Sequence, residues 1–304
     1  MPVRKNMKKI NVVCYGIDSE DKIVGYDYIL NDIFQNYDVN LIKCLLVEDL
    51  DDSDGNFDVL IYHCRNPEIL CHFGYSPTYE QVLNAVEKFK PKIVVQLMDE
   101  FWQEYNQFHH QIANHCNLVL KQFRHWYHEY PDNIIQIPLG YGTGFLNNQT
   151  SIKSMYDRKY TWSWTGHLKT NRYEMIQEFW RIWHHVCACN GGLSITETQQ
   201  WYGDSVFVPC GRGNNSLDCW RNYEATVAGA IPVVVGPRDE IEIAFKFTEL
   251  PPWIYGDTWK EVVDKCQMII DNREEMQRMQ NENLRWWNRV MNHIRKKIDK
   301  AFEI

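Results

Sequence analysis

The stretch VFVPCGRGNNSLDCWRNYEATVAGAIPVVVG, residues 206–236, decides the fold, because it contains a strand, a glycine-rich loop, a helix and a second strand in succession. Val206–Val208 is a short apolar run that leads into Pro209, and Ile231–Val235 is the kind of apolar run that forms a buried parallel strand. Between them, apolar residues recur at helical spacing, with Asn215 or Ser216 as the expected helix cap and Gly229 as the expected end. The stretch therefore predicts one unit of a parallel α/β sheet.

The loop at the start of this unit has the composition of an anion-binding site. Gly211 and Gly213 flank Arg212, so backbone N–H groups, a guanidinium and the following helix N-terminus all favour negative charge. Arg221 and Glu224 lie three residues apart on the predicted helix and so share a face. The carboxylate could accept hydrogen bonds from ribose hydroxyls while the arginine reaches a phosphate; the alternative is a surface ion pair.

A second loop with the same character follows the aromatic strand predicted at Tyr160–Thr165. Its sequence holds a glycine and two cations before a helix that Asn171 and Glu174 would cap: Gly166, His167, Lys169 and Arg172. We expect the helix to continue to the glycines at 191–192. Cations beside the positive end of a helix dipole repel it, which favours an anion there. The alternative is a basic first turn without a ligand.

The residues of both loops resemble the donor-binding motif of exostosin-like glycosyltransferases. That motif is matched by the residues Gly211-Arg212-Gly213, Ser216, Arg221, Glu224-Ala225 and Gly229-Ala230-Ile231-Pro232-Val233. Pro209, just before the loop, is a further candidate donor-binding residue. Residues 228–237 are also similar to the ending found in α-1,3-fucosyltransferases. The resemblance implies a GT-B fold: two Rossmann-like doubly wound α/β domains facing a cleft. It implies that the loop residues above contact a nucleotide-sugar diphosphate and that Glu224 holds the ribose.

The first half of the chain alternates strands and helices, which predicts a parallel sheet that binds ligands beyond the carboxyl ends of its strands. Two of the predicted strands, DVLIYHCR and KIVVQLMDE, end in polar residues. They are similar to fucosyltransferase strands after which a histidine–arginine pair and a catalytic glutamate stand. By that resemblance His63 is a catalytic-site residue, and Asp99 or Glu100 is the general base. The alternative is a solvated carboxylate pair that caps the next helix.

The composition bounds the remaining possibilities. A net charge of −8 argues against nucleic acid as a partner, and no apolar run is long enough to span a membrane. Scattered cysteines inside apolar runs favour a reducing compartment, so we expect a soluble, cytoplasmic protein, in the host cytoplasm if the protein is viral. The acidic run at residues 48–54 could hold Mn²⁺, but it is typical of a solvated loop; a zinc site at His184, His185, Cys187 and Cys189 is also disfavoured.

These observations lead to one expected architecture and function. We expect an acceptor-side domain at 1–145, a nucleotide-sugar domain at 146–280 and a terminal helix at 281–304 that crosses back. The resemblance, which extends to compact viral capsid-glycan xylosyltransferases, implies an inverting, metal-independent transfer of xylose from UDP-xylose to an oligosaccharide or glycoprotein glycan, without a resident cofactor. The alternatives are a GDP-fucose-dependent fucosyltransferase, a carbohydrate-binding module without activity, and a nucleotide-sugar hydrolase.

Overall fold

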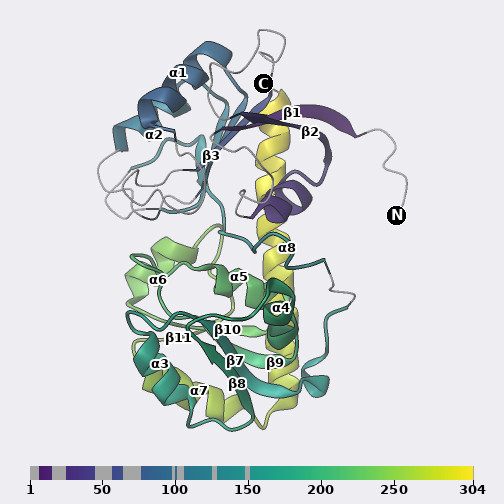
Figure 1. Ribbon diagram of the computed structural model, residues 1–304, viewed down its shortest axis with the longest axis vertical. Helices are drawn as coiled ribbons and strands as arrows, with labels where there is room; N and C mark the ends of the chain where they lie inside the picture. The colour runs from purple at the N-terminus through teal and green to yellow at the C-terminus, as the bar shows by residue number, and fades with distance from the viewer. Residues whose placement is uncertain are drawn as a thin grey trace. The chain divides into compact units, whose positions relative to one another are not determined.

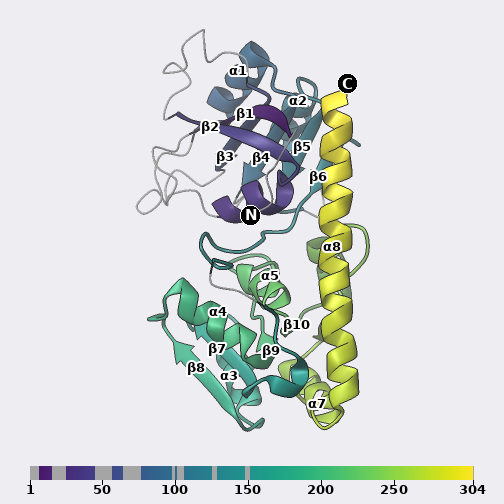
Figure 2. The same ribbon diagram turned by 90° about the vertical axis from the view of Figure 1, so that its right-hand side faces the viewer.

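The computed structural model describes residues 7–15, 25–44, 57–63, 77–97, 100, 106–124, 129–147 and 151–303. The chain divides into two compact units, the first formed by residues 1–137 with 291–304 and the second by residues 138–290. Each unit is built on a parallel sheet (Figures 1 and 2). No helix in the described part of the chain combines the length and apolar character needed to cross a bilayer.

The first unit contains a six-stranded sheet in the order β2-β1-β3-β4-β5-β6. Its strands are β1 (Lys8–Tyr15), β2 (Tyr37–Cys44), β3 (Val59–His63), β4 (Ile93–Leu97), β5 (Leu118–Lys121) and β6 (Ile134–Gln136). Its helices are η2 (Tyr28–Ile33), a short π-helix, α1 (Tyr79–Phe89) and α2 (Asn106–Ala113). The helices α1 and α2 pack side by side in both views, and apolar residues of both contribute to one core with β1, β3, β4 and β5 (Figures 1 and 2).

The second unit contains a five-stranded sheet in the order β11-β10-β9-β7-β8. Its strands are β7 (Tyr160–Gly166), β8 (His185–Cys189), β9 (Ser205–Pro209), β10 (Ile231–Val235) and β11 (Ile254–Gly256). The short 3-10 turn η5 (Met155–Asp157) precedes β7, and the helices are α3 (Arg172–Phe179), α4 (Ile195–Gly203), α5 (Trp220–Val227), α6 (Arg238–Phe245) and α7 (Trp259–Ile269). In Figure 1, α4 and α5 lie on one side of this sheet, and α3 and α7 lie on the other.

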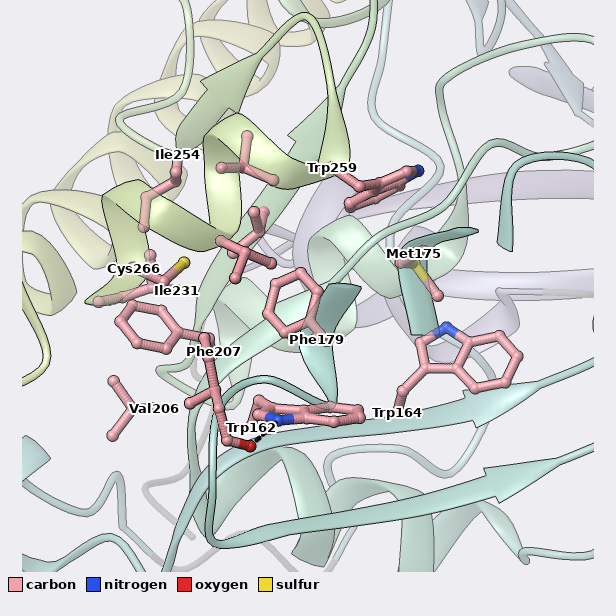
Figure 3. Close-up of a cluster of buried hydrophobic side chains, with 14 of the residues drawn as sticks. Trp162, Trp164, Met175, Phe179, Val206, Phe207, Ile231, Ile254, Trp259 and Cys266 are labelled. Carbon is pink, nitrogen blue, oxygen red and sulfur yellow. Dashed lines mark hydrogen bonds between the residues drawn. The ribbon is translucent and has the colours of Figure 1, made fainter. Parts of the chain in front are cut away.

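The core of the second unit lies between the sheet and the α3–α7 pair, and it is rich in aromatic rings (Figure 3). Trp162 is fully buried, donates its indole N–H to the Ile182 carbonyl at 3.0 Å, and meets the Phe179 ring edge-on at 5.4 Å. Phe179 in turn meets Trp259 of α7 at 6.3 Å. Large rings on β7, α3 and α7 thus fix the position of α3, whose first residue lies at the candidate site.

The long helix α8 (Arg273–Glu303) begins in the second unit, and its last turns belong to the first. Within the second unit, Gln280 donates from its side-chain amide to the Gly229 carbonyl at 2.8 Å. Within the first unit, the Ala301 and Phe302 carbonyls accept hydrogen bonds from the side chains of Asn117 and Lys92. Helix α8 is therefore a structural component of both units.

Two helix predictions need correction. Helix α5 begins at Trp220 with Cys219 as its N-cap, rather than at Asn215 or Ser216, because residues 210–219 remain an irregular loop. Helix α3 ends at Phe179 rather than at residues 191–192. Residues 185–189 pair with β7 as the parallel strand β8, in which the Cys187 and Cys189 sulfurs lie 3.6 Å apart. Residues 185–189 thus form an edge strand beside β7, where helical spacing predicted a longer helix.

Candidate functional site

The strand order of the second unit locates the site. Counted from β7, the strand order is 2-1-3-4-5: β8 is added on one side of β7, and β9 and the later strands are added on the other, so the order reverses between the parallel neighbours β7 and β9. Ligands of parallel α/β sheets bind outside the carboxyl ends of the strands at such a switch point. The loops that leave these two ends are residues 166–171 and 210–219, the same two loops that the sequence predicts to bind anions.

Arg172, the first residue of α3, joins the two loops. Its side chain donates from Nε and Nη2 to the Arg212 carbonyl at 3.1 and 2.7 Å and from Nη1 to the His167 carbonyl at 3.0 Å. It is only 5% exposed. Its charge is therefore directed at the backbone of both loops, which makes it a residue that positions them.

Asn171 adds a second connection between the loops. Its side-chain oxygen accepts a hydrogen bond from the Arg212 backbone N–H at 3.2 Å and makes no capping bond to α3. The expected capping box with Glu174 is therefore wrong, because the Asn171 oxygen is used across the loops instead. The loops predicted from the sequence to converge do converge.

Gly211 and Gly166 stand where the two loops pack against the side chains of Arg172 and Arg221. Gly211 lies against the first turn of α3, and a Cβ there would stand 2.6 Å from Cγ of Arg172. Gly166 has a φ of +147°, and a Cβ there would stand 2.5 Å from a guanidinium nitrogen of Arg221. A side chain at either position would separate groups that now touch, which explains the glycines of both motifs on packing grounds.

Arg212 and Lys169 are the cations at the mouth of the loops. The Arg212 guanidinium donates to both oxygens of Glu240, in the first turn of α6, at 2.5 and 2.7 Å, and to the Asn215 carbonyl at 2.8 Å. Both side chains of this ion pair are about one-third exposed or less, at 28% and 32%. The Lys169 ammonium donates to the side-chain oxygen of Asn214, so it connects the two loops as well.

Arg221 and Glu224 lie on one face of α5 but point to different neighbours. Arg221 donates from Nε to the Thr165 carbonyl at 2.9 Å, and its guanidinium lies 5.5 Å from the centre of the Trp164 ring. Glu224 accepts a hydrogen bond from the Gly142 backbone N–H at 3.3 Å. Burial raises the pKa of Glu224 to about 7, although Arg221 and the Gly142 N–H lower it. The surface ion pair that the spacing allowed is not what the structure contains.

The remaining predicted residues of this unit surround the same loops. Pro209 ends β9, and its neighbour Cys210 is buried. Gly213 donates its backbone N–H to the Ser216 carbonyl at 2.8 Å, and the Ser216 hydroxyl accepts from the Asp218 N–H at 3.0 Å. His167 is exposed and contributes its carbonyl to Arg172.

The catalytic residues predicted in the first unit are only partly described. His63 is the last residue of β3 and is 4% exposed, and Glu100 follows β4 and is 9% exposed. Asp99 lies outside the described residues, as does the acidic run at 48–54. Their catalytic roles stay predictions. Within the described ranges, no three His, Cys, Asp or Glu side chains are grouped as metal ligands would be.

The sequence did not reveal the role of Glu240, nor the cluster of Cys210, Cys219 and Asn222 near Arg221. Glu240 stands in a first turn, where acidic residues are common for dipole reasons alone, so only the fold connects it to Arg212. Cys219 donates its thiol to the Asn222 side-chain oxygen at 2.7 Å. A hydrogen bond from Cys210, together with Arg221, lowers the pKa of the Cys219 thiol against the effect of burial.

No protein-family model matches the chain, and no curated protein matches it in sequence. Solved structures do match it. An alpha-glucosyltransferase in complex with UDP and a 13-mer DNA is 10% identical, with a TM-score of 0.57 over 97% of this chain and all of that one. A UDP-N-acetylglucosamine 2-epimerase from Listeria monocytogenes has a TM-score of 0.55, and an alpha1,3-fucosyltransferase with GDP has 0.51.

The epimerase and the fucosyltransferase are also 10% identical to this chain, and cover 97% and 99% of it at 97% and 92% of their own lengths. The chain has the GT-B fold. The expected fold class of two Rossmann-like α/β domains is therefore confirmed. At this identity the likeness concerns the fold.

The exclusion of nucleic acid as a partner was wrong. It rested on the net charge of −8, yet the chain shares its fold with a glucosyltransferase whose structure contains DNA. A net charge sums over the whole surface, whereas a bound polyanion is attracted by the local groups at its own site. Overall acidity therefore does not decide the class of acceptor.

Proposed function

We propose that the chain is a nucleotide-sugar glycosyltransferase whose donor diphosphate binds at the loops 166–171 and 210–219. The observation that carries this proposal is the junction of the two loops at the switch point of the sheet, where Arg172 bonds to carbonyls of both. The fold likeness to proteins solved with UDP and with GDP supports a nucleoside diphosphate as the ligand. The motif resemblance of residues 206–236 supports the same reading.

The chemistry follows from where negative charge develops. When an acceptor hydroxyl attacks the anomeric carbon, the bond to the diphosphate breaks and charge grows on the β-phosphate. Lys169, Arg212 and the N-terminus of α3 would stabilise that charge, and removing one such contact costs about 2.7–4 kcal/mol of barrier in comparable sites. Glu224 would accept the ribose hydroxyls. Direct displacement inverts the anomeric centre, and the acceptor proton would pass to Asp99 or Glu100.

The donor is UDP-xylose in this proposal, a choice that rests on the exostosin-like resemblance, and the transfer needs no metal. The competing donor is GDP-fucose, which the fucosyltransferase-like ending at residues 228–237 favours. The acceptor is a glycan hydroxyl, and an acceptor hydroxyl on nucleic acid is the competing class.

Thermal unfolding with nucleotides tests the donor. UDP at about one hundred times its Kd should stabilise the protein by about 2.7 kcal/mol, and GDP at equal concentration should stabilise it less. A larger effect of GDP would replace UDP-xylose by GDP-fucose. If neither nucleotide shifts the transition, the donor site is elsewhere or absent. Release of UDP from UDP-xylose only when a glycan is added separates a transferase from a hydrolase and from an inactive binding module.

The raised pKa of Glu224 predicts that donor binding depends on pH. Only the ionised carboxylate accepts two hydroxyl hydrogen bonds, and with a pKa of about 7 the ionised fraction grows between pH 6 and 8. The affinity for UDP-xylose, whose diphosphate does not titrate there, should rise roughly tenfold over this range. Titration calorimetry on the wild type and on Glu224→Gln measures it. The variant should lose the pH dependence, and the exposed control Glu174→Gln should keep it.

The raised pKa of Glu224 makes the free energy of unfolding depend on pH in the opposite direction to donor affinity. Because the folded state holds the proton up to a pKa of about 7, while the ordinary value is 4.5, Glu224 stabilises the fold fully below 4.5. That contribution is lost as the pH rises to 7. Stability and donor affinity should therefore change in opposite directions between pH 6 and 8. Parallel changes would show that another group controls binding.

A further inference from the structure

A row of polar side chains crosses the sheet of the first unit at the carboxyl ends of its strands. The strand register aligns five residues across β1, β3, β4, β5 and β6: Tyr15, Tyr62, Gln96, Lys121 and Gln136. Residues paired in register between parallel strands share a face, so these side chains project from the same side of the sheet. The carboxyl ends of parallel strands are the edge where ligands bind.

The row two residues earlier on the same face is entirely apolar. It consists of Val13, Leu60, Val94, Val119 and Ile134, all of which belong to the core that includes residues of α1 and α2. The face therefore changes from aliphatic to hydrogen-bonding in a single step of the pleat. A core that only packed helices would have no need of amides and an ammonium group in this row.

Two members of the polar row, Lys121 and Gln96, are buried, although lysine and glutamine side chains are usually exposed to solvent. Lys121 is 2% exposed. Gln96 is fully buried, and within the described residues both atoms of its side-chain amide lack a hydrogen-bond partner. Buried amides are rarely left so, because losing their bonds to water destabilises the fold.

A cavity of about 200 Å³ lies at the end of the row. Lys121 and Gln136 line it, together with Arg124, Asp132 and the aromatic ring of Tyr130. The Arg124 guanidinium lies 5.9 Å from the centre of the Tyr130 ring. The lining thus combines two cations with one carboxylate, a primary amide and two aromatic rings, those of Tyr130 and Phe123. Rings and amides suit the C–H faces and hydroxyls of a sugar, and the excess cation suits an anionic substituent on it.

We propose that this cavity and the polar row bind an acidic sugar, a monosaccharide unit that carries a carboxylate or a phosphate, as the acceptor. The inference rests on the proposed function for the word acceptor. The Lys121 ammonium and the Arg124 guanidinium bind the anionic substituent, and the amide of Gln136 binds a hydroxyl. The volume of about 200 Å³ suits a single sugar unit.

Titration calorimetry without nucleotide tests the site with a matched ligand pair, methyl β-glucuronide and methyl β-glucoside, which differ only in the carboxylate. The glucuronide should bind roughly tenfold more tightly, as a charge-assisted hydrogen bond predicts. Glucose 6-phosphate in a third titration distinguishes a phosphate from a carboxylate. Equal affinity for the charged and uncharged glycosides overturns the proposal. It is also overturned if a DNA oligonucleotide binds more tightly than either glycoside and loses that affinity in Lys121→Met.

Three variants separate binding from folding. Lys121→Met should remove the preference for the charged glycosides, the exposed Arg124→Met should weaken it if the first variant does not fold, and the exposed control Lys88→Met should leave it unchanged. Gln136→Leu should weaken both glycosides to the same extent, because it removes an uncharged amide that lines the cavity. A Gln136→Leu variant with lower stability and intact binding would show that the row is structural.

The outcomes also separate this inference from the proposed function. If the acidic glycosides bind but neither UDP nor GDP shifts the unfolding transition, the sugar-site proposal stands and the transferase proposal is wrong. A nucleotide response without any binding of acidic sugars would do the reverse.

Discussion

Arg172→Met is expected to weaken UDP binding about a hundredfold, a loss of about 2.8 kcal/mol at about 1.4 kcal/mol for each tenfold. The side chain ties the His167 and Arg212 carbonyls to α3 through three N–H groups, so its removal lets loops 166–171 and 210–219 move apart. It also leaves two partly buried backbone carbonyls without their donors, which should lower the free energy of unfolding by about 1–3 kcal/mol. Calorimetry with UDP and chemical denaturation measure the two effects.

Arg181→Met is the matched control for this variant. Arg181 follows α3 and pairs with Glu178 and Asp264 at 2.8 Å, but its side chain is 40% exposed. Exposed pairs contribute about 0–1 kcal/mol, so neither UDP binding nor stability should change much. An Arg172→Met protein that binds UDP as tightly as the wild type would mean that the loop junction does not form the donor site. Arg172→Lys should behave like Arg172→Met, because one ammonium cannot reach both carbonyls.

The convergence of the two loops could be predicted from the sequence, because both follow short apolar strands of one alternating unit. The sequence predicts that Gly166 and Gly211 allow the loop backbone to bind an anion. The structure gives each a packing reason, since Arg221 and Arg172 occupy the space that a side chain would need. Asn171 illustrates the limit of local patterns: spacing predicted a helix cap, whereas its oxygen binds the Arg212 N–H, a contact between residues 41 apart in the chain.

Longer-range features depend on facts that a single sequence does not carry. Helical spacing of apolar residues continued past Phe179, yet residues 185–189 became β8, because a free edge of β7 was available for backbone pairing. The polar row of the first unit depends on strand register, which places Gln96 beside Lys121 although each lies in its own apolar run. Glu240 likewise meets Arg212 only after the chain has folded.

Opposite effects are expected from the two partners of the Arg212–Glu240 ion pair. Glu240 holds both nitrogens of the guanidinium fork, at 2.5 and 2.7 Å, so a diphosphate must compete with a carboxylate for Arg212. Arg212→Met should weaken UDP binding about a hundredfold, since a charged hydrogen bond to the ligand is lost. Glu240→Gln should tighten it about tenfold, because the amide competes less well and a negative charge leaves the site.

A double-mutant cycle decides what this pair does. If Arg212 binds the diphosphate, Glu240→Gln should have no effect in the Arg212→Met background, because the group it releases is gone. The control pair Arg238 and Glu242 lies on the same helix, with side chains 67% and 39% exposed, and its substitution should change UDP affinity little. If Glu240→Gln instead weakens binding as much as Arg212→Met does, the ion pair serves to hold α6 in place. The phosphate ligand would then have to be sought at Lys169 and the N-terminus of α3.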